Sequence, residues 1–291
     1  MAMIPCLWTD MLTEAEPDEA IRLIGEAGFR QVEFGLTHEK LYLEGKEDEG
    51  SRIERIRRAA ERAGVEIVQM HGHMFNLCDD NADEDIARAH RSIRRAAQLG
   101  VRWVVLHPGS HQDAGADPEV MEWTRRRNLE VFSAFARTAE EWGTGIAVEN
   151  MIGRNRHGGR FGVTTGDLLW LVASVASDRV GICWDTGHAL LSGIPQGPAI
   201  RAVGPRLVAL HVADNDGHMD RHWAPHRGKV NWVEVMGALH AIGYDGPFNL
   251  EVPGEAMATP GAAKPEQMRY LYRLCEVLLD PAYVEQAVAQ G

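Results

Sequence analysis

The sequence lacks the features that mark secreted and membrane-inserted proteins. It has only four cysteines in 291 residues, and they are far apart with no C-x-x-C pair: Cys6, Cys78, Cys183 and Cys275. This usage predicts reduced, mostly buried thiols and a cytoplasmic location. The N-terminus has no basic segment followed by a long apolar stretch, so no signal peptide is expected. No apolar run is long enough to cross a membrane.

Positive charge is also scarce. The chain has 30 Lys and Arg residues against 42 Asp and Glu residues, and its formal net charge is −12. This balance gives no support to a broad nucleic-acid or membrane surface. No Pro/Ser-rich linker, low-complexity tract or short repeat divides the chain, so one domain over residues 1–291 is expected. The sequence leaves the oligomeric state open, a homo-oligomer included.

What the chain does contain is an alternation of short apolar runs and helix-like segments. The runs are rich in Val, Ile and Leu, as buried parallel strands are. They lie near residues 3–8, 31–35, 65–71, 101–107, 145–149, 180–185, 207–212 and 247–251. Helices are predicted between them, near residues 17–27, 51–63, 83–99, 118–142, 165–176, 198–204, 232–242 and 265–279.

This alternation predicts an α/β fold, a single (β/α)₈ TIM barrel. A doubly wound open sheet is the competing interpretation, but it would place its site at one switch point. Polar residues with ligand chemistry instead follow at least six of the strands, as in a barrel, whose sites form at the carboxyl ends of its strands. The segments after these ends are long and polar and are predicted as functional loops: 72–82, 108–117, 150–164, 186–197, 213–230 and 252–264.

Four strands end in a residue that can bind a metal: Glu149, Asp185, His211 and Glu251. A charged group at the end of a buried strand is costly unless it has a partner. If the four meet at one rim, they can share a divalent cation. Three carboxylates and one imidazole suit Mn²⁺, Zn²⁺, Co²⁺ or Mg²⁺.

Five further residues of ligand type fall in the same places: His71, His107, His188, Asp220 and His222. A single histidine at a strand end is more often a hydrogen-bonded structural residue. Nine acidic and histidine residues at one rim indicate a metal or catalytic site instead.

Aromatic and basic residues at the same rim are open to two interpretations. Trp8 ends the first strand and could stack on a sugar ring, although tryptophan more often packs in a core. Arg154, Arg156 and Arg160 lie in the segment after Glu149. They could meet a phosphate or carboxylate, or they could be solvated surface residues.

These residues resemble the xylose-isomerase-like TIM barrels. The resemblance rests on Glu149-Asn150, Asp185-Thr186-Gly187-His188, His211, Asp220-x-His222 and Glu251. The runs His-Val-Ala-Asp-Asn-Asp-Gly and Gly-Tyr-Asp-Gly-Pro-Phe-Asn-Leu-Glu are most similar to proteins called sugar phosphate isomerase/epimerase. The resemblance implies a metal-dependent sugar isomerase or epimerase whose partner is a small carbohydrate.

Resemblance to the ketohexose 3-epimerases implies individual roles. Glu149, Asp185, His211 and Glu251 would hold one metal, and the two glutamates would also be the catalytic acid/base pair. His188 would contact a substrate oxygen, and His107, Trp8 and Arg154 are further candidates for substrate binding. The chain departs from those epimerases at Asn155 and Gly217, where they carry a substrate-contacting Glu and Arg. This departure argues against a free ketohexose as the substrate.

Resemblance to endonuclease IV implies an alternative, a multinuclear-zinc phosphoesterase acting at apurinic sites. Three zinc ions would be held by His71, His107 and Glu149; by Glu149, Asp185, His211 and Glu251; and by His188, Asp220 and His222. All nine positions are filled, yet no aromatic and basic loop compels DNA binding. A related lyase or dehydratase, or a binding protein that kept the metal site without turnover, stays open as a third class.

Overall fold

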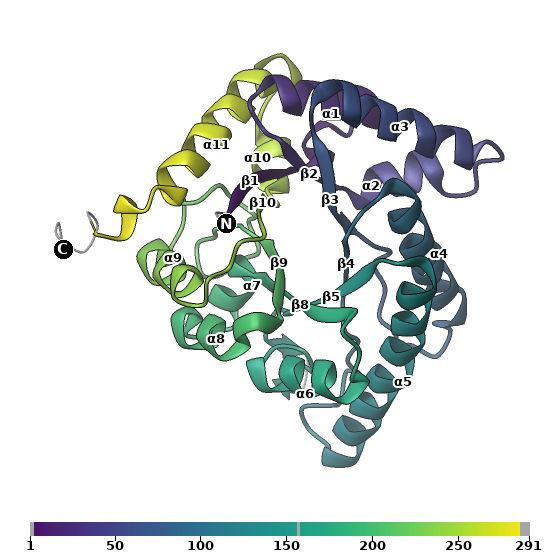
Figure 1. Ribbon diagram of the computed structural model, residues 1–291. Coiled ribbons are helices and arrows are strands. Elements are labelled where there is room, and N and C mark those ends of the chain that lie inside the picture. The colour runs from purple at the N-terminus through teal and green to yellow at the C-terminus, as the bar shows by residue number, and fades with distance from the viewer. Residues whose placement is uncertain (1–2, 156–157, 286–291) are drawn as a thin grey trace.

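Eight parallel strands line the centre of the protein in a computed structural model that describes residues 3–155 and 158–285. Helices surround the strands, as the view along the barrel axis shows (Figure 1). The strands are β1 (Ile4–Trp8), β2 (Gln31–Phe34), β3 (Glu66–His71), β4 (Trp103–Leu106), β5 (Gly145–Glu149), β8 (Val180–Asp185), β9 (Leu207–His211) and β10 (Pro247–Leu250). Each lies within two residues of a predicted strand, because short Val/Ile/Leu runs are a strong local signal.

The sheet closes on itself. Each strand pairs with the next one in the chain, and β10 pairs with β1. The remaining gap, between β9 and β10, is bridged just past the end of β9. The Val212 N–H donates to the Asn249 carbonyl (2.8 Å), and the Glu251 N–H donates to the Val212 carbonyl (3.3 Å). These bonds complete a (β/α)₈ barrel, so the open-sheet alternative is wrong.

The predicted helices are all present. They are α1 (Pro17–Glu26), α3 (Glu49–Ala63), α4 (Asp83–Leu99), α5 (Pro118–Trp142), α6 (Thr165–Val175), α8 (Gln196–Val203), α9 (Trp232–Ala241) and α11 (Lys264–Leu279). Gly64, Gly100 and Gly143 end α3, α4 and α5 with φ of 63°, 82° and 78°. This left-handed conformation is cheap only for glycine, so the sequence signal for these ends was reliable.

The segments predicted as loops hold structure that the sequence did not reveal. They contain α7 (Thr186–Leu191), α10 (Pro253–Ala258) and the hairpin of β6 (Arg154–Asn155) with β7 (Gly158–Gly159). After β2 come α2 (Leu36–His38) and a single π-helical turn (Glu39–Leu43). Three 3₁₀ turns lie at Thr9–Leu12, Gly204–Arg206 and Gly261–Ala263. Such short helices and turns carry little periodicity, so the sequence analysis did not predict them.

Two separate apolar cores hold the fold. The larger one fills the space between the sheet and the helices. The smaller one lies inside the barrel and consists of Val105, Ala147, Cys183 and Ala209, with Trp103 and Val208 packed against it. All four cysteines are buried and free, as their spacing predicted.

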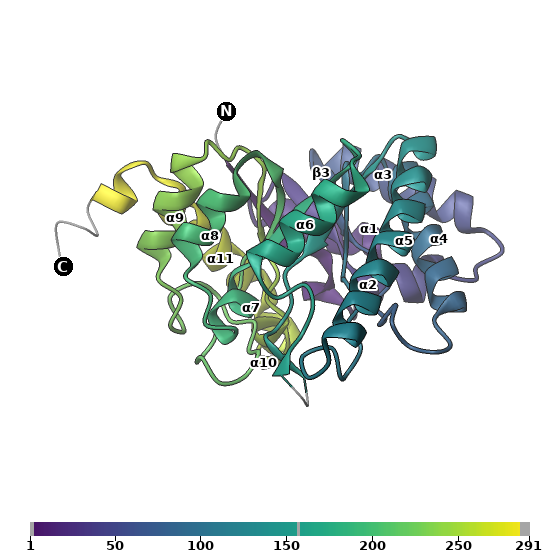
Figure 2. The same ribbon diagram turned by 90° about the horizontal axis from the view of Figure 1, so that it is seen from below.

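The two ends of the barrel can be told apart by the short helices that follow two of the strands. α7 and α10 lie at the lower edge of the molecule in Figure 2, opposite the N-terminus. They follow β8 and β10 directly, so this edge is the carboxyl end of the strands, where barrel enzymes place their sites. Among the described residues, no helix combines the length and the apolar character that a membrane span requires.

Candidate metal centre

The four predicted central ligands meet at one point. Glu149, Asp185 and His211 end β5, β8 and β9, and Glu251 follows β10. One ligand atom from each lies within 4.8 Å of every other. His211 Nδ1 is 3.3 Å from Glu149 Oε1 and 3.3 Å from Glu251 Oε2. A single cation could contact all four side chains after small movements.

Two buried atoms of this group lack a hydrogen bond. Within the described part of the chain, Asp185 Oδ2 and His211 Nδ1 are buried and have no hydrogen-bond partner. An unsatisfied buried polar atom costs about 1–3 kcal/mol. Both atoms belong to the central group and carry lone pairs, so the residues fit a divalent cation, which would satisfy both at once.

The backbone around Asp185 is held by its neighbours. The Asp185 N–H donates to Asn150 Oδ1 (2.6 Å), and Asn150 Nδ2 donates to the Asp185 carbonyl (2.9 Å). Asp185 Oδ1 accepts from the His188 N–H (2.6 Å) and so caps the first turn of α7. One carboxylate oxygen therefore fixes the helix, and the other faces the central point.

His71 and His107 form the neighbouring pair that the sequence predicted. Their ring centroids are 5.1 Å apart. His107 Nε2 lies 3.0 Å from Glu149 Oε2, and His71 Nε2 lies 3.9 Å from the same oxygen. The Gly72 carbonyl, 2.9 Å from His71 Nδ1, accepts the proton on that nitrogen and leaves Nε2 for the cluster. These three residues form a second group of possible metal ligands.

His188, Asp220 and His222 form the outer group. Asp220 Oδ2 lies 2.9 Å from His222 Nε2 and 3.4 Å from His188 Nε2. His222 adopts φ of 44°, in the left-handed region that residues other than glycine rarely adopt. The segment that carries Asp220 and His222 packs tightly on α10: a Cβ added at Gly254 would lie 2.0 Å from the Arg221 carbonyl oxygen.

The cluster shifts the proton affinities of its members in opposite directions. Burial favours the neutral acid, but the charges of His211 and His107 hold the pKa of Glu149 well below its ordinary value. Burial raises the pKa of Glu251 to about 7. Burial opposes charge on His222, yet Asp220 and Glu251 raise its pKa to about 9. The cluster thus holds negative charge that either protons or a cation must balance.

Glu33 is a site residue that the sequence interpretation missed. It lies on β2, is fully buried, and its Oε1 is 3.0 Å from His211 Nε2. The available signal was a carboxylate in the middle of the apolar run Val-Glu-Phe, where an unpartnered charge would be costly.

The predicted substrate residues are placed only in part. Trp8 is half-buried at the end of β1. The backbone of Arg154 belongs to the β6–β7 hairpin, whereas its side chain and all of Arg156 lie outside the described residues. Arg160 lines a cavity of about 800 Å³ together with Asn76, Ser110 and Gln112, on the segments that follow β3, β4 and β5.

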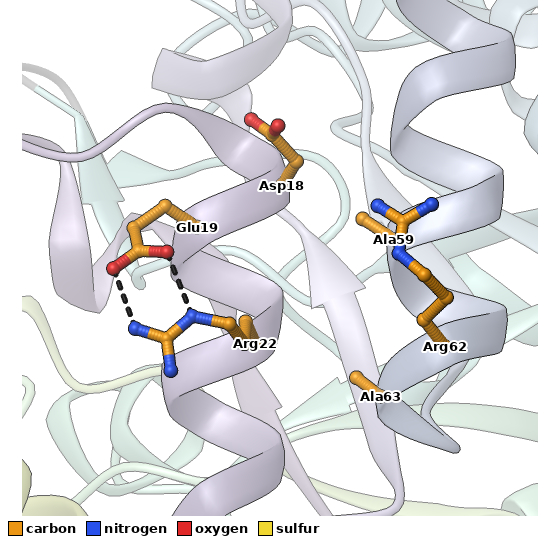
Figure 3. A pocket seen from close by; sticks show the side chains of 6 residues that line it. All are labelled: Asp18, Glu19, Arg22, Ala59, Arg62 and Ala63. Atoms are coloured by element: carbon orange, nitrogen blue, oxygen red, sulfur yellow. Dashed lines mark hydrogen bonds and ion pairs between the residues drawn. The ribbon is translucent and has the colours of Figure 1, made fainter.

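Another pocket lies far from this chemistry. Figure 3 shows a pocket of about 280 Å³ between α1 and α3, where Glu19 pairs with Arg22 and Arg62 lies opposite. It lies between two helices of the outer shell, whereas the nine clustered residues lie at and beyond the carboxyl ends of the strands. The barrel rim is therefore the candidate site.

Comparison with known proteins agrees with this geometry. Residues 21–274 match the family model described as xylose isomerase-like TIM barrel. The chain belongs to this family. The matched residues include β2 to β10 and all nine clustered residues.

Relatives within the family carry different descriptions. An uncharacterised protein from Methanocaldococcus jannaschii is 30% identical over 200 residues, 66% of each chain. A probable endonuclease 4 from Geobacillus kaustophilus is 29% identical over 210 residues, 65% of this chain and 66% of that one. The chain thus matches slightly less than two thirds of the length of these two relatives.

Solved structures with the same fold include sugar epimerases. A D-tagatose 3-epimerase-like protein superposes with a TM-score of 0.75 at 24% identity, covering 98% of this chain and 100% of the other. A D-psicose 3-epimerase superposes with a TM-score of 0.76 at 19% identity, covering 95% and 99%. Identities this low show that the fold is shared and leave the reaction to be argued from the site.

Proposed function

We propose that the protein is a metal-dependent isomerase or epimerase that moves a proton at a carbon of a polyhydroxylated carbonyl compound. The observation that carries the proposal is the central group, in which two glutamates flank His211 at equal distances of 3.3 Å. Proton transfer at carbon needs one group to remove the proton and another to return it. Glu149 and Glu251 are the two candidates.

The barrel brings the two glutamates to the site from different directions. They come from β5 and β10, which are separated in the sheet by β8 and β9. Each could therefore reach a different face of a carbon held between them. The opposite shifts of their pKa values fit a division of labour in which one is ionised and the other exchanges its proton near neutral pH.

Glu149, Asp185, His211 and Glu251 would hold the metal, with Mn²⁺, Co²⁺, Zn²⁺ and Mg²⁺ as candidates. A divalent cation bound there would supply Lewis acidity, which makes a C–H bond beside a carbonyl more acidic. His188 would position a substrate oxygen. The Asn150 carbonyl accepts the proton on its Nδ1 (2.8 Å), and its Nε2, which lies 3.4 Å from Asp220 Oδ2, is the atom that would contact that oxygen.

The surrounding residues favour a small polar substrate. The cavity lined by Asn76, Ser110, Gln112 and Arg160 also has Asp79, Asp80 and Asp85 in its wall, so it offers both donors and acceptors to the hydroxyl groups of a polar molecule. Trp8 could stack on a sugar ring, and Arg154 could meet an anionic group. Gly217 cannot supply the arginine contact of the ketohexose 3-epimerases, so the substrate is expected to be a phosphorylated or otherwise modified sugar, or an inosose-type compound.

The proposal is tested by hydrogen exchange at carbon. Ketoses, their phosphates and inosose-type compounds are incubated with the metal-loaded protein in heavy water, and deuterium uptake is measured by mass spectrometry. The wild type should exchange one C–H position of its substrate. Glu251→Gln should lower exchange by at least about 10²–10⁴-fold, because an amide cannot act as the base.

The control separates chemistry from folding. Glu39 is also a buried glutamate, but it lies in the π-helical turn after β2 and pairs with Arg95 on α4, outside the metal cluster. Glu39→Gln should keep its exchange rate in whatever fraction stays folded. Absence of exchange on every compound of the panel by metal-loaded wild-type protein would contradict the proposal.

A second candidate function is a multinuclear-zinc phosphoesterase of the endonuclease IV type. The nine residues form the three ligand groups that such a centre needs, and relatives described as probable endonuclease 4 match the chain. The charge at the carboxyl end of the barrel disfavours DNA binding. The segment after β3 carries the exposed acidic residues Asp79, Asp80, Asp83 and Glu84, which would repel a polyanion.

Two measurements separate the candidates. Elemental analysis of gently purified protein should find one Mn or Co per chain for the epimerase, and three Zn for the phosphoesterase. An oligonucleotide with an abasic site should stay intact. If it were cut by the wild type and not by His107→Ala, with no carbon exchange on any sugar, the phosphoesterase would replace the leading proposal.

A further inference from the structure

Glu33 is a buried carboxylate that no part of the proposed reaction uses. It is 0% exposed on β2 and lies inside the barrel beside the metal cluster. Among the side chains that the structure describes, no lysine or arginine lies within ion-pair distance of it, and His211 is its one ion-pair contact. A buried carboxylate is costly unless it is paired and hydrogen-bonded, so the pair of Glu33 with His211 is expected to have a role.

Three N–H donors from three other strands surround Glu33. His211 on β9 approaches Oε1 with its Nε2 at 3.0 Å, and Gln69 on β3 donates to the same oxygen at 3.2 Å. Asn249 on β10 donates to Oε2. The amide oxygens of Gln69 and Asn249 are buried without a partner, so both side chains give up a hydrogen bond on one side while their N–H groups meet Glu33. Glu33 therefore acts as an acceptor only.

This arrangement decides which ring nitrogen of His211 is available. A hydrogen bond to Glu33 requires a proton on Nε2, and Nδ1 then carries the lone pair when the ring is neutral. Nδ1 is the atom that lies 3.3 Å from both Glu149 and Glu251 and has no hydrogen bond of its own. The opposite tautomer would set two lone pairs against each other at Glu33 and point a proton at the metal position.

We propose that Glu33 is a positioning residue for His211: it holds the proton on Nε2, aims Nδ1 at the metal position, and adds negative charge that raises the affinity for a divalent cation. The inference rests on the metal site of the proposed function. It concerns metal binding itself, so it can be tested without knowing the substrate.

The test compares Glu33→Gln with the matched variant Glu39→Gln. Protein stripped with a chelator is titrated with Mn²⁺ and with Co²⁺ by calorimetry, and the visible absorption of the Co²⁺ form is recorded. Glu33→Gln keeps an acceptor but loses the charge, and its affinity should fall by about 10–100-fold, as for other residues that support a metal-bound histidine. Its Co²⁺ spectrum should shift. Glu39→Gln should bind both ions as the wild type does.

Thermal unfolding separates positioning from a merely structural role. Removing one partner of the buried Glu33–His211 pair is expected to lower the stability of the metal-free protein whichever role Glu33 has, so the deciding quantity is the stabilisation gained from the metal. The stabilisation gained on adding Mn²⁺ should shrink. A structural role alone would lower the melting temperature with and without metal and leave the gain unchanged, and that result, or wild-type affinity in folded Glu33→Gln, would overturn the inference.

A second measurement needs no variant of Glu33. Zn²⁺-loaded wild-type protein labelled with ¹⁵N in histidine should show the His211 ring with its proton on Nε2, assigned against His211→Asn. A proton on Nδ1 would overturn the inference. If the wild type binds metal but moves no proton at carbon, the proposed function falls and the role of Glu33 stands. If the wild type binds no divalent ion, both fall.

Discussion

The two sides of the barrel interior differ in their side chains: one is apolar and the other is polar. On one side, β4, β5, β8 and β9 contribute small apolar residues that form one cluster: Val105, Ala147, Cys183 and Ala209. On the other side, β2, β3 and β10 contribute the polar residues Glu33, Gln69 and Asn249, all fully buried. Both sides lie next to the ligand cluster, but they support it in different ways.

The apolar side is a rigid platform. Each of its four residues lies two positions before a ligand-type residue on the same strand or, for His107, just past its end, so both members of each pair point to the same face. Below them the packing leaves no room for a side chain. A Cβ at Gly145 would lie 2.4 Å from the Trp103 ring, and one at Gly181 would lie 2.5 Å from Val208. Tight packing here fixes the backbone positions from which the side chains of His107, Glu149, Asp185 and His211 project.

The polar side acts through hydrogen bonds instead. Glu33 gathers donors from three strands and contacts His211 through the nitrogen that faces away from the cluster. The difference indicates that packing on the apolar side sets the positions of the metal-ligand residues. Hydrogen bonding on the polar side sets the orientation of the His211 ring and the charge beside it. Three predictions test this contrast, in order of expected effect.

The largest effect should follow from placing a charge on the apolar side. In Ala147→Asp a carboxylate would enter a fully buried apolar cluster in which no donor is positioned to receive it. An uncompensated buried charge costs about 3–5 kcal/mol, so urea unfolding should show a loss of stability of that size. Wild-type stability of Ala147→Asp would mean that the apolar side is not a dry, packed platform.

A smaller effect should follow from removing one donor on the polar side. Gln69→Leu takes one of the three N–H donors from Glu33. Because the buried carboxylate of Glu33 then has one hydrogen bond fewer, urea unfolding should show a loss of about 1–3 kcal/mol of stability. Affinity for Mn²⁺ should fall by less than in Glu33→Gln, because the charge and the contact to His211 both remain. Equal losses of affinity in the two variants would contradict the division of roles.

The smallest effect concerns pH and the ligand cluster that both sides support. In the metal-free protein the pKa of Glu251 is raised from 4.5 to about 7 and that of His222 from 6.5 to about 9. Both folded-state values exceed the unfolded ones, so each group stabilises the fold at low pH. The contribution of Glu251 is lost as the pH rises through 7, and that of His222 as it rises through 9.

A bound cation replaces those protons, so its effect should grow with pH. The rise in melting temperature on adding Mn²⁺ should be larger at pH 8.5 than at pH 6.0, by on the order of 2–4 °C for each kcal/mol involved. The measurement is thermal unfolding with and without metal at both pH values. A rise that is larger at pH 6.0 would show that the cluster is not where the metal and the protons compete.

Much of this organisation could be predicted locally. The strands were recognisable as Val/Ile/Leu runs, and the ends of α3, α4 and α5 as glycines, because both signals depend on neighbouring residues alone. The nine ligand-type residues could be named because each follows a strand that would place it at one rim. The structure brings all nine into groups whose ligand atoms lie within 4.8 Å of one another.

Other features could not be predicted this way. α7 is too short for a periodic pattern and begins where Asp185 caps the His188 N–H, a bond that depends on the site itself. In the sequence, Glu33 is a single charged residue in a short strand. Its role depends on hydrogen bonds from His211, Gln69 and Asn249, which lie much later in the chain.

The sequence by itself thus determined the alternation of strands and helices and the residue types at the strand ends, because these follow from local periodicity and burial. Only the tertiary structure decided which of those residues meet. The bonds of Val212 to Asn249 and Glu251 close the barrel between β9 and β10, and the register across the sheet brings Glu33 to His211, 178 residues away. Contacts between such distant residues depend on how the strands pair and where the barrel closes, and no local pattern encodes either.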